Sequence, residues 1–153
     1  VKSGSGSWSL SNANSYSGLS TVSVGTLAIS HSSALGSVTS GTVVSSGATL
    51  WLQGDLSIGN ESLSLNGVGV SSLGALRNNS GNNTWGGTIS LTGASTIYAD
   101  AGLLTLSPSG RETYQICSRK RSNTIRFLNI VEQKVCPPIC STMKVYVQQP
   151  MGL

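Results

Sequence analysis

The sequence predicts an all-β protein in which residues 1–107 form a β-solenoid, a stack of short strands wound into coils. Three observations lead to this prediction. Small polar residues dominate this part of the chain, its apolar residues alternate with polar ones, and a short strand phrase recurs along it. Residues 108–153 share none of these features, and we expect them to form an irregular tail.

Composition divides the chain near Pro108. Of the first 107 residues, 60 are Ser, Thr, Gly or Asn, whereas these types supply only 11 of the last 46. All four prolines and all three cysteines lie in the tail, and the formal charge is −1 before the boundary and +5 after it. A Ser/Gly-rich composition alone is typical of flexible linkers. The order of the residues decides between a linker and a fold.

Apolar residues occupy alternate positions in a series of short runs, a pattern that linkers lack. Because successive side chains of a strand point to opposite faces, such runs predict strands with one buried face. The pairs are Val22 and Val24, Leu27 and Ile29, Leu50 and Leu52, Leu56 and Ile58, Leu63 and Leu65, Val68 and Val70, Ile89 and Leu91, and Leu104 and Leu106. We expect Val24 and Leu50 to face inward and Ser23 to face outward.

A phrase of the form small-x-apolar-x-apolar-polar recurs as GTLAIS, ATLWLQ, ESLSLN, GTISLT and GLLTLS. If their first apolar residues are equivalent, the offsets are 23, 13, 26 and 15. The equivalent residues are then Leu27, Leu50, Leu63, Ile89 and Leu104. Uneven offsets favour coils with loops of different length, and ~20 residues per coil gives about five coils. The chain starts at Val1 with no visible signal peptide and no apolar run long enough to span a membrane. We expect a fragment that continues into further repeats of a longer chain.

Residues 4–107 resemble the autotransporter-associated β-strand repeat. An Asn-x-Tyr-x-Gly opening precedes a Thr-containing strand, a GTL phrase, an ALG turn and the phrase SGATL. The residues that carry the resemblance are Asn14, Tyr16 and Gly18; Gly25, Thr26 and Leu27; Ala34, Leu35 and Gly36; and Ser46 through Leu50.

The resemblance implies a right-handed parallel β-helix in the exported passenger of a large bacterial surface protein. It implies a secreted or cell-surface location, associated with the outer membrane, and a role as a structural or adhesive stalk. It transfers no catalytic residue, so we expect no enzyme activity. The alternative function is a polysaccharide-binding or polysaccharide-processing β-helix. The partner would then be a carbohydrate, and otherwise an unknown surface.

Reactive side chains are sparse in residues 1–107. His31 follows a predicted strand and has no carboxylate nearby in sequence to orient it, so we expect an exposed loop residue. Asp55, Glu61 and Asp100 are the only acidic residues of this part, and we expect them on the surface or in turns rather than in a cluster for calcium or sugar hydrolysis. We therefore predict no catalytic, cofactor-binding or metal-binding residues, and no cofactor.

The aromatic residues could serve a sugar or the core. Trp85, in GNNTWGG, could stack on a sugar, although packing in the fold is the more common use of such a residue. A carbohydrate-binding module would need an exposed row of aromatics. The candidates are Trp8, Tyr16, Trp51, Trp85 and Tyr98.

The tail offers weak motifs. Cys117, Cys136 and Cys140 fall one ligand short of a structural zinc site, and spacing leaves their disulfide state open. The basic cluster of Arg119, Lys120 and Arg121 is too small to predict nucleic-acid binding. An abrupt change from Gly and Ser to Arg, Cys and Pro is typical of a shifted reading frame, and we hypothesise that this explains residues 108–153. If the adjacent reading frame after Ser107 encodes no further β-repeat, that hypothesis is wrong.

Overall fold

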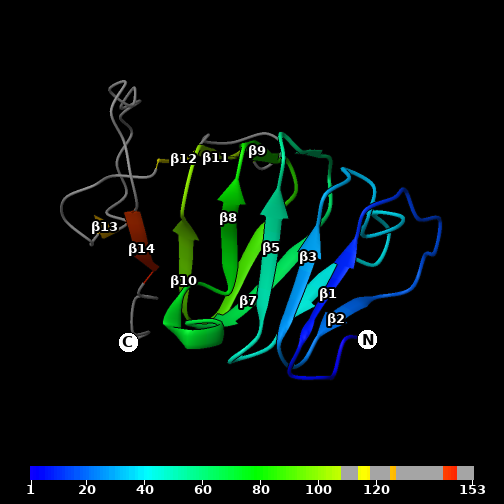
Figure 1. The fold of residues 1–153 in the computed structure, drawn as a ribbon, viewed down its shortest axis with the longest axis horizontal. Helices are drawn as coiled ribbons and strands as arrows, with labels where there is room; N and C mark the ends of the chain where they lie inside the picture. The colour runs from blue at the N-terminus through cyan, green and yellow to red at the C-terminus, as the bar shows by residue number, and fades with distance from the viewer. Residues whose placement is uncertain (108–113, 118–124, 127–142, 148–153) are drawn as a thin grey trace, which may run out of the picture.

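The computed structural model describes residues 1–107 in full and, for their backbone, the strands 114–117, 125–126 and 143–147. The described part contains strands, turns and one short 3-10 helix, η1 (Val70–Ser72), with no α-helix. The strands wind into a β-solenoid of about five turns, which confirms the predicted fold class (Figure 1).

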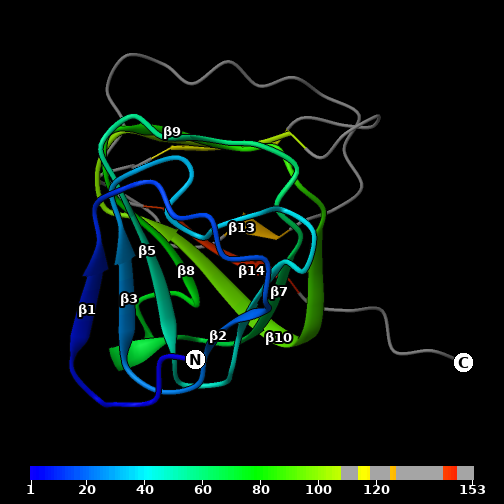
Figure 2. The same ribbon diagram turned by 90° about the vertical axis from the view of Figure 1, so that its right-hand side faces the viewer.

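Three parallel sheets enclose the interior of the solenoid. Figure 2, which looks along the coils, shows the sheets on different sides of one hollow outline. Sheet 1 contains β1 (Ser7–Leu10), β3 (Thr26–Ile29), β5 (Thr49–Gln53) and β8 (Leu76–Ser80). Sheet 2 contains β2 (Ser20–Val22), β4 (Thr42–Val44) and β7 (Leu63–Gly67). Sheet 3 contains β6 (Ser57–Ile58), β9 (Asn82–Trp85) and β11 (Leu103–Leu106).

The long strand β10 (Ile89–Ala99) belongs to two of these sheets. Its first part pairs with β7 of sheet 2, and its last residues pair with β8 of sheet 1. The register shifts between Leu91 and Ser95, where the strand turns the corner. In the earlier coils a glycine turn separates the two sheets at this point, with φ of +75° at Gly25 and +81° at Gly47. A positive φ is a conformation that glycine adopts without steric cost.

The core consists of rows of side chains that stack from coil to coil. In sheet 1, Leu27, Leu50, Leu76 and Ile97 lie in register, and none is more than 5% exposed. These residues are 23, 26 and 21 positions apart, so each coil is slightly longer than expected. Stacking aliphatic side chains in a narrow interior removes most of their surface from water.

The recurring phrase does not mark one equivalent point per coil, as the sequence had suggested. Leu27 and Leu50 share a row in sheet 1, but Leu63 and Ile89 pair in sheet 2, and Leu104 lies in sheet 3. The reason is that all three sheets of a coil need the same alternation, so the phrase recurs more than once per coil.

The inward assignment was wrong for Val24 and Val68. Val22 is fully buried, but Val24 is 46% exposed and Val68 is 42% exposed, while Val70 is half-buried in η1. Alternation holds only while the strand continues. β2 ends at Val22, and the chain then turns toward Gly25, so Val24 points away from the interior. Ser23, expected to face outward, is half-buried.

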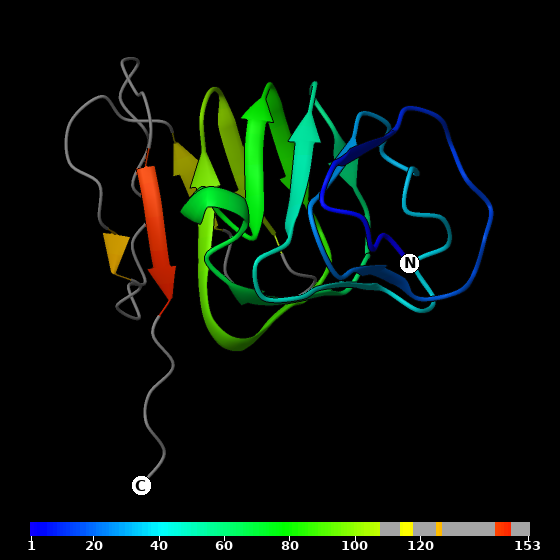
Figure 3. The ribbon, with the colours of Figure 1, turned by 60° about the horizontal axis from the view of Figure 1, so that its bottom comes forward.

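The described strands of the tail add to the solenoid in the opposite sense. β12 (Tyr114–Cys117) pairs antiparallel with β11, and β14 (Met143–Val147) pairs antiparallel with β10. β13 (Ile125–Arg126) pairs parallel with β14. These strands are regular structure where irregular structure was expected, because the last coil offers backbone groups that a strand can pair with. Figure 3 shows β14 beside the last coil, at the end opposite the N-terminus.

Several tail residues lie outside the described residues. They are Cys136, Cys140, Arg119, Lys120 and Arg121. The boundary at 107/108 and the reading-frame hypothesis stay predictions. Within the described residues, no helix has the length and apolar character needed to cross a membrane.

Candidate functional site

Some of the residues that carried the family resemblance, Asn14, Tyr16, Ala34 and Gly36, meet where two loops stack at the N-terminal end. The loop after β1 lies on the loop after β3, and their backbones bond directly, with Asn14 N donating to Ser33 O at 3.0 Å. The Asn14 side-chain amide donates to the Ala34 carbonyl at 2.7 Å, and the Tyr16 hydroxyl lies 3.3 Å from the same oxygen. The Asn-x-Tyr opening therefore stacks one coil on the next.

Gly36 is required by this stacking. Its φ is +82°, and a Cβ at this position would lie 2.3 Å from the Tyr16 carbonyl oxygen and 2.8 Å from its ring. The ALG turn thus ends in the residue type that permits close approach of Tyr16. The residue after Gly36 in the same loop, Ser37, donates its backbone N–H to the Tyr16 carbonyl at 2.8 Å.

Asn78 lies inside the solenoid at the corner between sheets 1 and 3. It occupies the inward position after Leu76 and is fully buried. Its amide donates to the carbonyl of Gly81 at 3.1 Å and to that of Ala101 at 2.7 Å. Both carbonyls belong to corners, where strand pairing is interrupted. The buried side chain therefore finds hydrogen-bond partners in two corner carbonyls, which ties the two corners together.

Asn83 completes this corner from the other side of the turn. It is 1% exposed, and its amide donates to the carbonyl of Ser80 at 2.8 Å and to the side-chain oxygen of Asn78. Its own side-chain oxygen accepts the Leu56 N–H of the preceding coil at 2.7 Å. Two buried amides thus link three successive coils.

Glu61 lies at the corner between sheets 3 and 2, and of the two positions expected for it, surface or turn, the surface is wrong. The residue is 2% exposed, and one carboxylate oxygen accepts the Thr42 hydroxyl at 2.7 Å. Burial raises the pKa of the Glu61 carboxyl above 4.5, and the Thr42 hydrogen bond opposes this in part. Its backbone carbonyl accepts the indole N–H of Trp85 at 2.8 Å. The carboxyl is enclosed by its own fold and faces no open cleft.

The other candidate reactive residues are dispersed. His31 is exposed in its loop, and its Nδ1 accepts the N–H of Ser33 at 3.0 Å. Asp55 is exposed in a turn and accepts the Asn82 N–H at 2.8 Å. Asp100 forms an ion pair with Arg77. Across the part that the structure describes, no three His, Cys, Asp or Glu side chains group closely enough to hold a metal.

Among residues 1–107, the aromatic side chains do not form an exposed row on any sheet. Trp85 is fully buried, and Trp51 and Tyr98 are half-buried on the outer face of sheet 1. The guanidinium of Arg77, between them in register, lies 4.9 Å from the Trp51 ring centre and 5.9 Å from that of Tyr98. Trp8 and Tyr16 are exposed, but both lie at the N-terminal end.

Sequence reasoning missed the buried Asn78, Asn83 and Glu61. A signal for Asn78 was present, because it continues the alternation that starts at Leu76. Asn83 precedes the buried Trp85 by two positions in the same way.

Comparison with known proteins gives one family match. Neither the curated proteins nor the solved structures contain a match to this chain. Residues 1–29 match the family described as passenger-associated-transport-repeat, and this segment includes the first coil and the strands β2 and β3 that it stacks on. The described coils and this match together fit an autotransporter passenger stalk, and the match at residues 1–29 supports an autotransporter passenger repeat in that segment.

Proposed function

We propose that this protein is a structural and adhesive stalk segment of an exported bacterial surface protein, without catalytic activity. The observation that supports the proposal most directly is the use of the interior. Its rows of aliphatic side chains and its buried amides all serve coil-to-coil contact. A stalk needs coils that repeat along its length, because each coil is stabilised by its neighbours.

The passenger repeat at residues 1–29 suggests a secreted or surface-exposed location. The test is to express the chain between an export signal and an outer-membrane transporter domain in a Gram-negative bacterium. We expect intact cells to present the chain to added protease and to an antibody against it. Retention inside the cell would contradict the proposal.

Adhesion and catalysis require separate measurements. We expect the purified chain to bind intact cells or immobilised glycans, and to release no reducing sugar from a panel of polysaccharides. Release of sugar would favour the alternative, a polysaccharide-processing β-helix. Absence of binding to every surface would leave the stalk role and remove the adhesive one.

A further inference from the structure

The outer face of sheet 1 carries a row of three large side chains, on strands that lie side by side (Figure 1). Trp51 of β5, Arg77 of β8 and Tyr98 of β10 are paired in register. Each follows a residue of the buried aliphatic row by one position, so all three side chains point away from the interior. The guanidinium lies 4.9 Å from the Trp51 ring centre, close to the spacing of neighbouring strands.

The guanidinium of Arg77 is fixed in position. Its Nη2 donates to one carboxylate oxygen of Asp100 at 3.0 Å, and its Nε donates to the other. The rings of Trp51 and Tyr98 lie on either side of it along the row. A planar group held by two rings and a carboxylate keeps its remaining N–H groups aimed in one direction.

Two donors of this row are open. Arg77 Nη1 and Trp51 Nε1 have no hydrogen-bond partner among the described residues. In the same part of the chain, Thr96 Oγ1 is the only buried side-chain N or O atom without a partner, so both donors reach solvent. An acceptor lies beside them, because a carboxylate accepts about four hydrogen bonds and Asp100 accepts two from Arg77.

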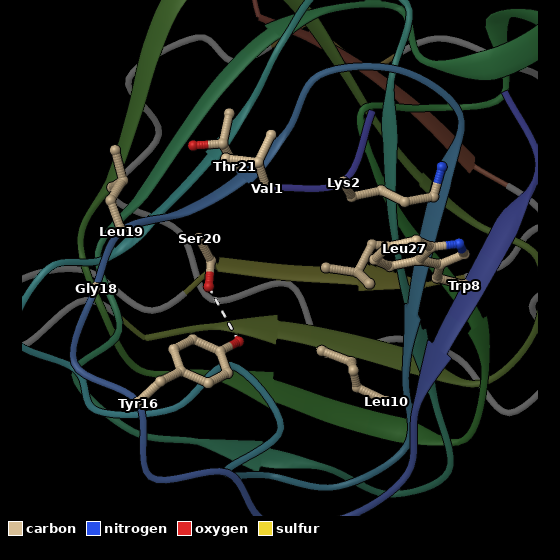
Figure 4. A pocket seen from close by; sticks show the side chains of 10 residues that line it. All are labelled: Val1, Lys2, Trp8, Leu10, Tyr16, Gly18, Leu19, Ser20, Thr21 and Leu27. Atoms are coloured by element: carbon tan, nitrogen blue, oxygen red, sulfur yellow. Dashed lines mark hydrogen bonds between the residues drawn. The ribbon is translucent and has the colours of Figure 1, made fainter. Parts of the chain in front are cut away.

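The charge of this row favours a neutral ligand. Arg77 and Asp100 cancel each other. The other cation of residues 1–107, Lys2, lines a cavity of about 310 Å³ at the N-terminal end (Figure 4). Its ammonium is bonded to the carbonyls of Gly4 and Val24, and the residue is 2% exposed. No second cation of residues 1–107 is therefore available to hold an anion at the row.

We propose that Trp51, Arg77, Tyr98 and Asp100 form a binding site for a neutral polysaccharide. Sugar hydroxyls both donate and accept, which matches two open donors beside a carboxylate, and the C–H groups of a sugar pack on aromatic rings. The proposal rests on the adhesive part of the proposed function and names its ligand class. Because the site lies on an open sheet face, we expect weak binding by one chain and strong binding by many chains together.

The test is the retardation of the purified full chain in native gels that contain dextran, mannan or hydroxyethyl cellulose. Dextran sulfate and hyaluronan are the acidic probes. Trp51→Phe removes the indole N–H and keeps a ring beside the guanidinium. The double variant Arg77→Met with Asp100→Asn removes both charges together, so no unpaired carboxylate remains. Trp8→Phe is the matched control, because Trp8 is 59% exposed and lies at the N-terminal cavity, away from the row (Figure 4).

We expect at least one neutral polysaccharide to retard the original chain and the Trp8→Phe variant equally. Trp51→Phe should weaken this retardation several-fold and the double variant should abolish it, with thermal melts showing that each variant is folded. Retardation by acidic probes alone, or equal retardation of folded row variants and the original chain, would overturn the proposal. Binding to intact cells without retardation by any neutral polysaccharide would overturn it and leave the adhesive function standing. A chain that binds neither cells nor any polysaccharide would remove both.

Discussion

Aliphatic side chains fill the interior at the middles of the sheets, whereas buried polar side chains lie at or next to the corners between them. In sheet 1 the row Leu27, Leu50, Leu76 and Ile97 is purely aliphatic. Glu61 at a corner, and Asn78 and Asn83 in the strands on either side of a corner, are each no more than 2% exposed. A narrow solenoid therefore has two kinds of interior.

The difference follows from the backbone. Within a sheet, each N–H and C=O pairs with the coil above or below, so the side chains need only fill space. At a corner the chain turns and the ladder stops, which leaves backbone groups inside the fold without strand partners. The Asn78 amide bonds to two such groups, the carbonyls of Gly81 and Ala101. Burial of polar side chains at these places thus stabilises the coil instead of weakening it.

The largest expected effect is on a sheet middle. Leu50→Asp places a charge in the aliphatic row without a partner, and we expect it to lower the free energy of unfolding by at least about 5 kcal/mol, comparable to the whole stability of a small domain. Thermal melts of the full chain followed by circular dichroism measure it. The control is Val24→Asp at a position that is 46% exposed, where we expect a change within about 0.5 kcal/mol. Equal losses in both variants would contradict the observed register.

Removing a buried amide beside a corner should lower the free energy of unfolding by less than Leu50→Asp, but by a measurable amount. Asn83→Ala leaves the Leu56 N–H and the side-chain oxygen of Asn78 without the partner that Asn83 gives them, and each buried unpaired group costs about 1–3 kcal/mol. Urea unfolding measures the loss. Asn82→Ala, one residue earlier and exposed, is the matched control, because its backbone bond to Asp55 remains. Similar stabilities of the two variants would show that the corner amides contribute little.

Two glycines with nearly the same φ test the contact between the stacked loops. Gly36 and Gly47 have φ of +82° and +81°, but a Cβ on Gly36 collides with Tyr16, whereas a Cβ on Gly47 meets no atom within 4 Å. Both alanine variants bear the conformational strain, of about 1–3 kcal/mol. We expect Gly36→Ala to be the less stable in thermal melts, and the difference isolates the contact between loops. If the two melt alike, the Tyr16 contact does not hold the coils together.

The sheet middles were predictable from the sequence, because burial of one strand face leaves a direct record in alternation. Leu27, Leu50 and Leu104 are all buried as this pattern indicated. The grouping of strands into sheets was not predictable. A parallel ladder places like residues above one another, but the same phrase serves three sheets, and only the coil length, here 21 to 26 residues along sheet 1, tells them apart.

The corners were harder for a physical reason. An Asn in a loop and an Asn bonded to the carbonyls of a buried turn have the same local sequence, and the difference arises from coils more than 20 residues away. The bond from Asn78 to Ala101 spans 23 positions, and that from Leu56 to Asn83 spans 27. The prediction that Val24 faces inward was wrong for a related reason, since alternation does not mark the residue at which a strand ends.

The smallest expected effect concerns Glu61, and it is seen in the pH dependence of stability. Because burial raises the folded-state pKa above 4.5, the folded protein holds this proton at pH values where the unfolded chain has lost it. The unfolded state then binds fewer protons, so the free energy of unfolding falls as pH rises from about 4.5 to the folded-state pKa, and this contribution is constant above that.

Glu61→Gln cannot ionise, and its side-chain oxygen can still accept the Thr42 hydroxyl. We therefore expect this variant to lose the decline above pH 4.5 and to be more stable than the original chain at pH 7, by urea unfolding at a series of pH values. Thr42→Val should raise the folded-state pKa of Glu61 further, because it removes the hydrogen bond that lowers this pKa. The fall in the free energy of unfolding should then extend to higher pH. Parallel profiles for the original chain and Glu61→Gln would mean that the carboxyl is solvated, and that this corner, unlike the one at Asn78 and Asn83, admits water.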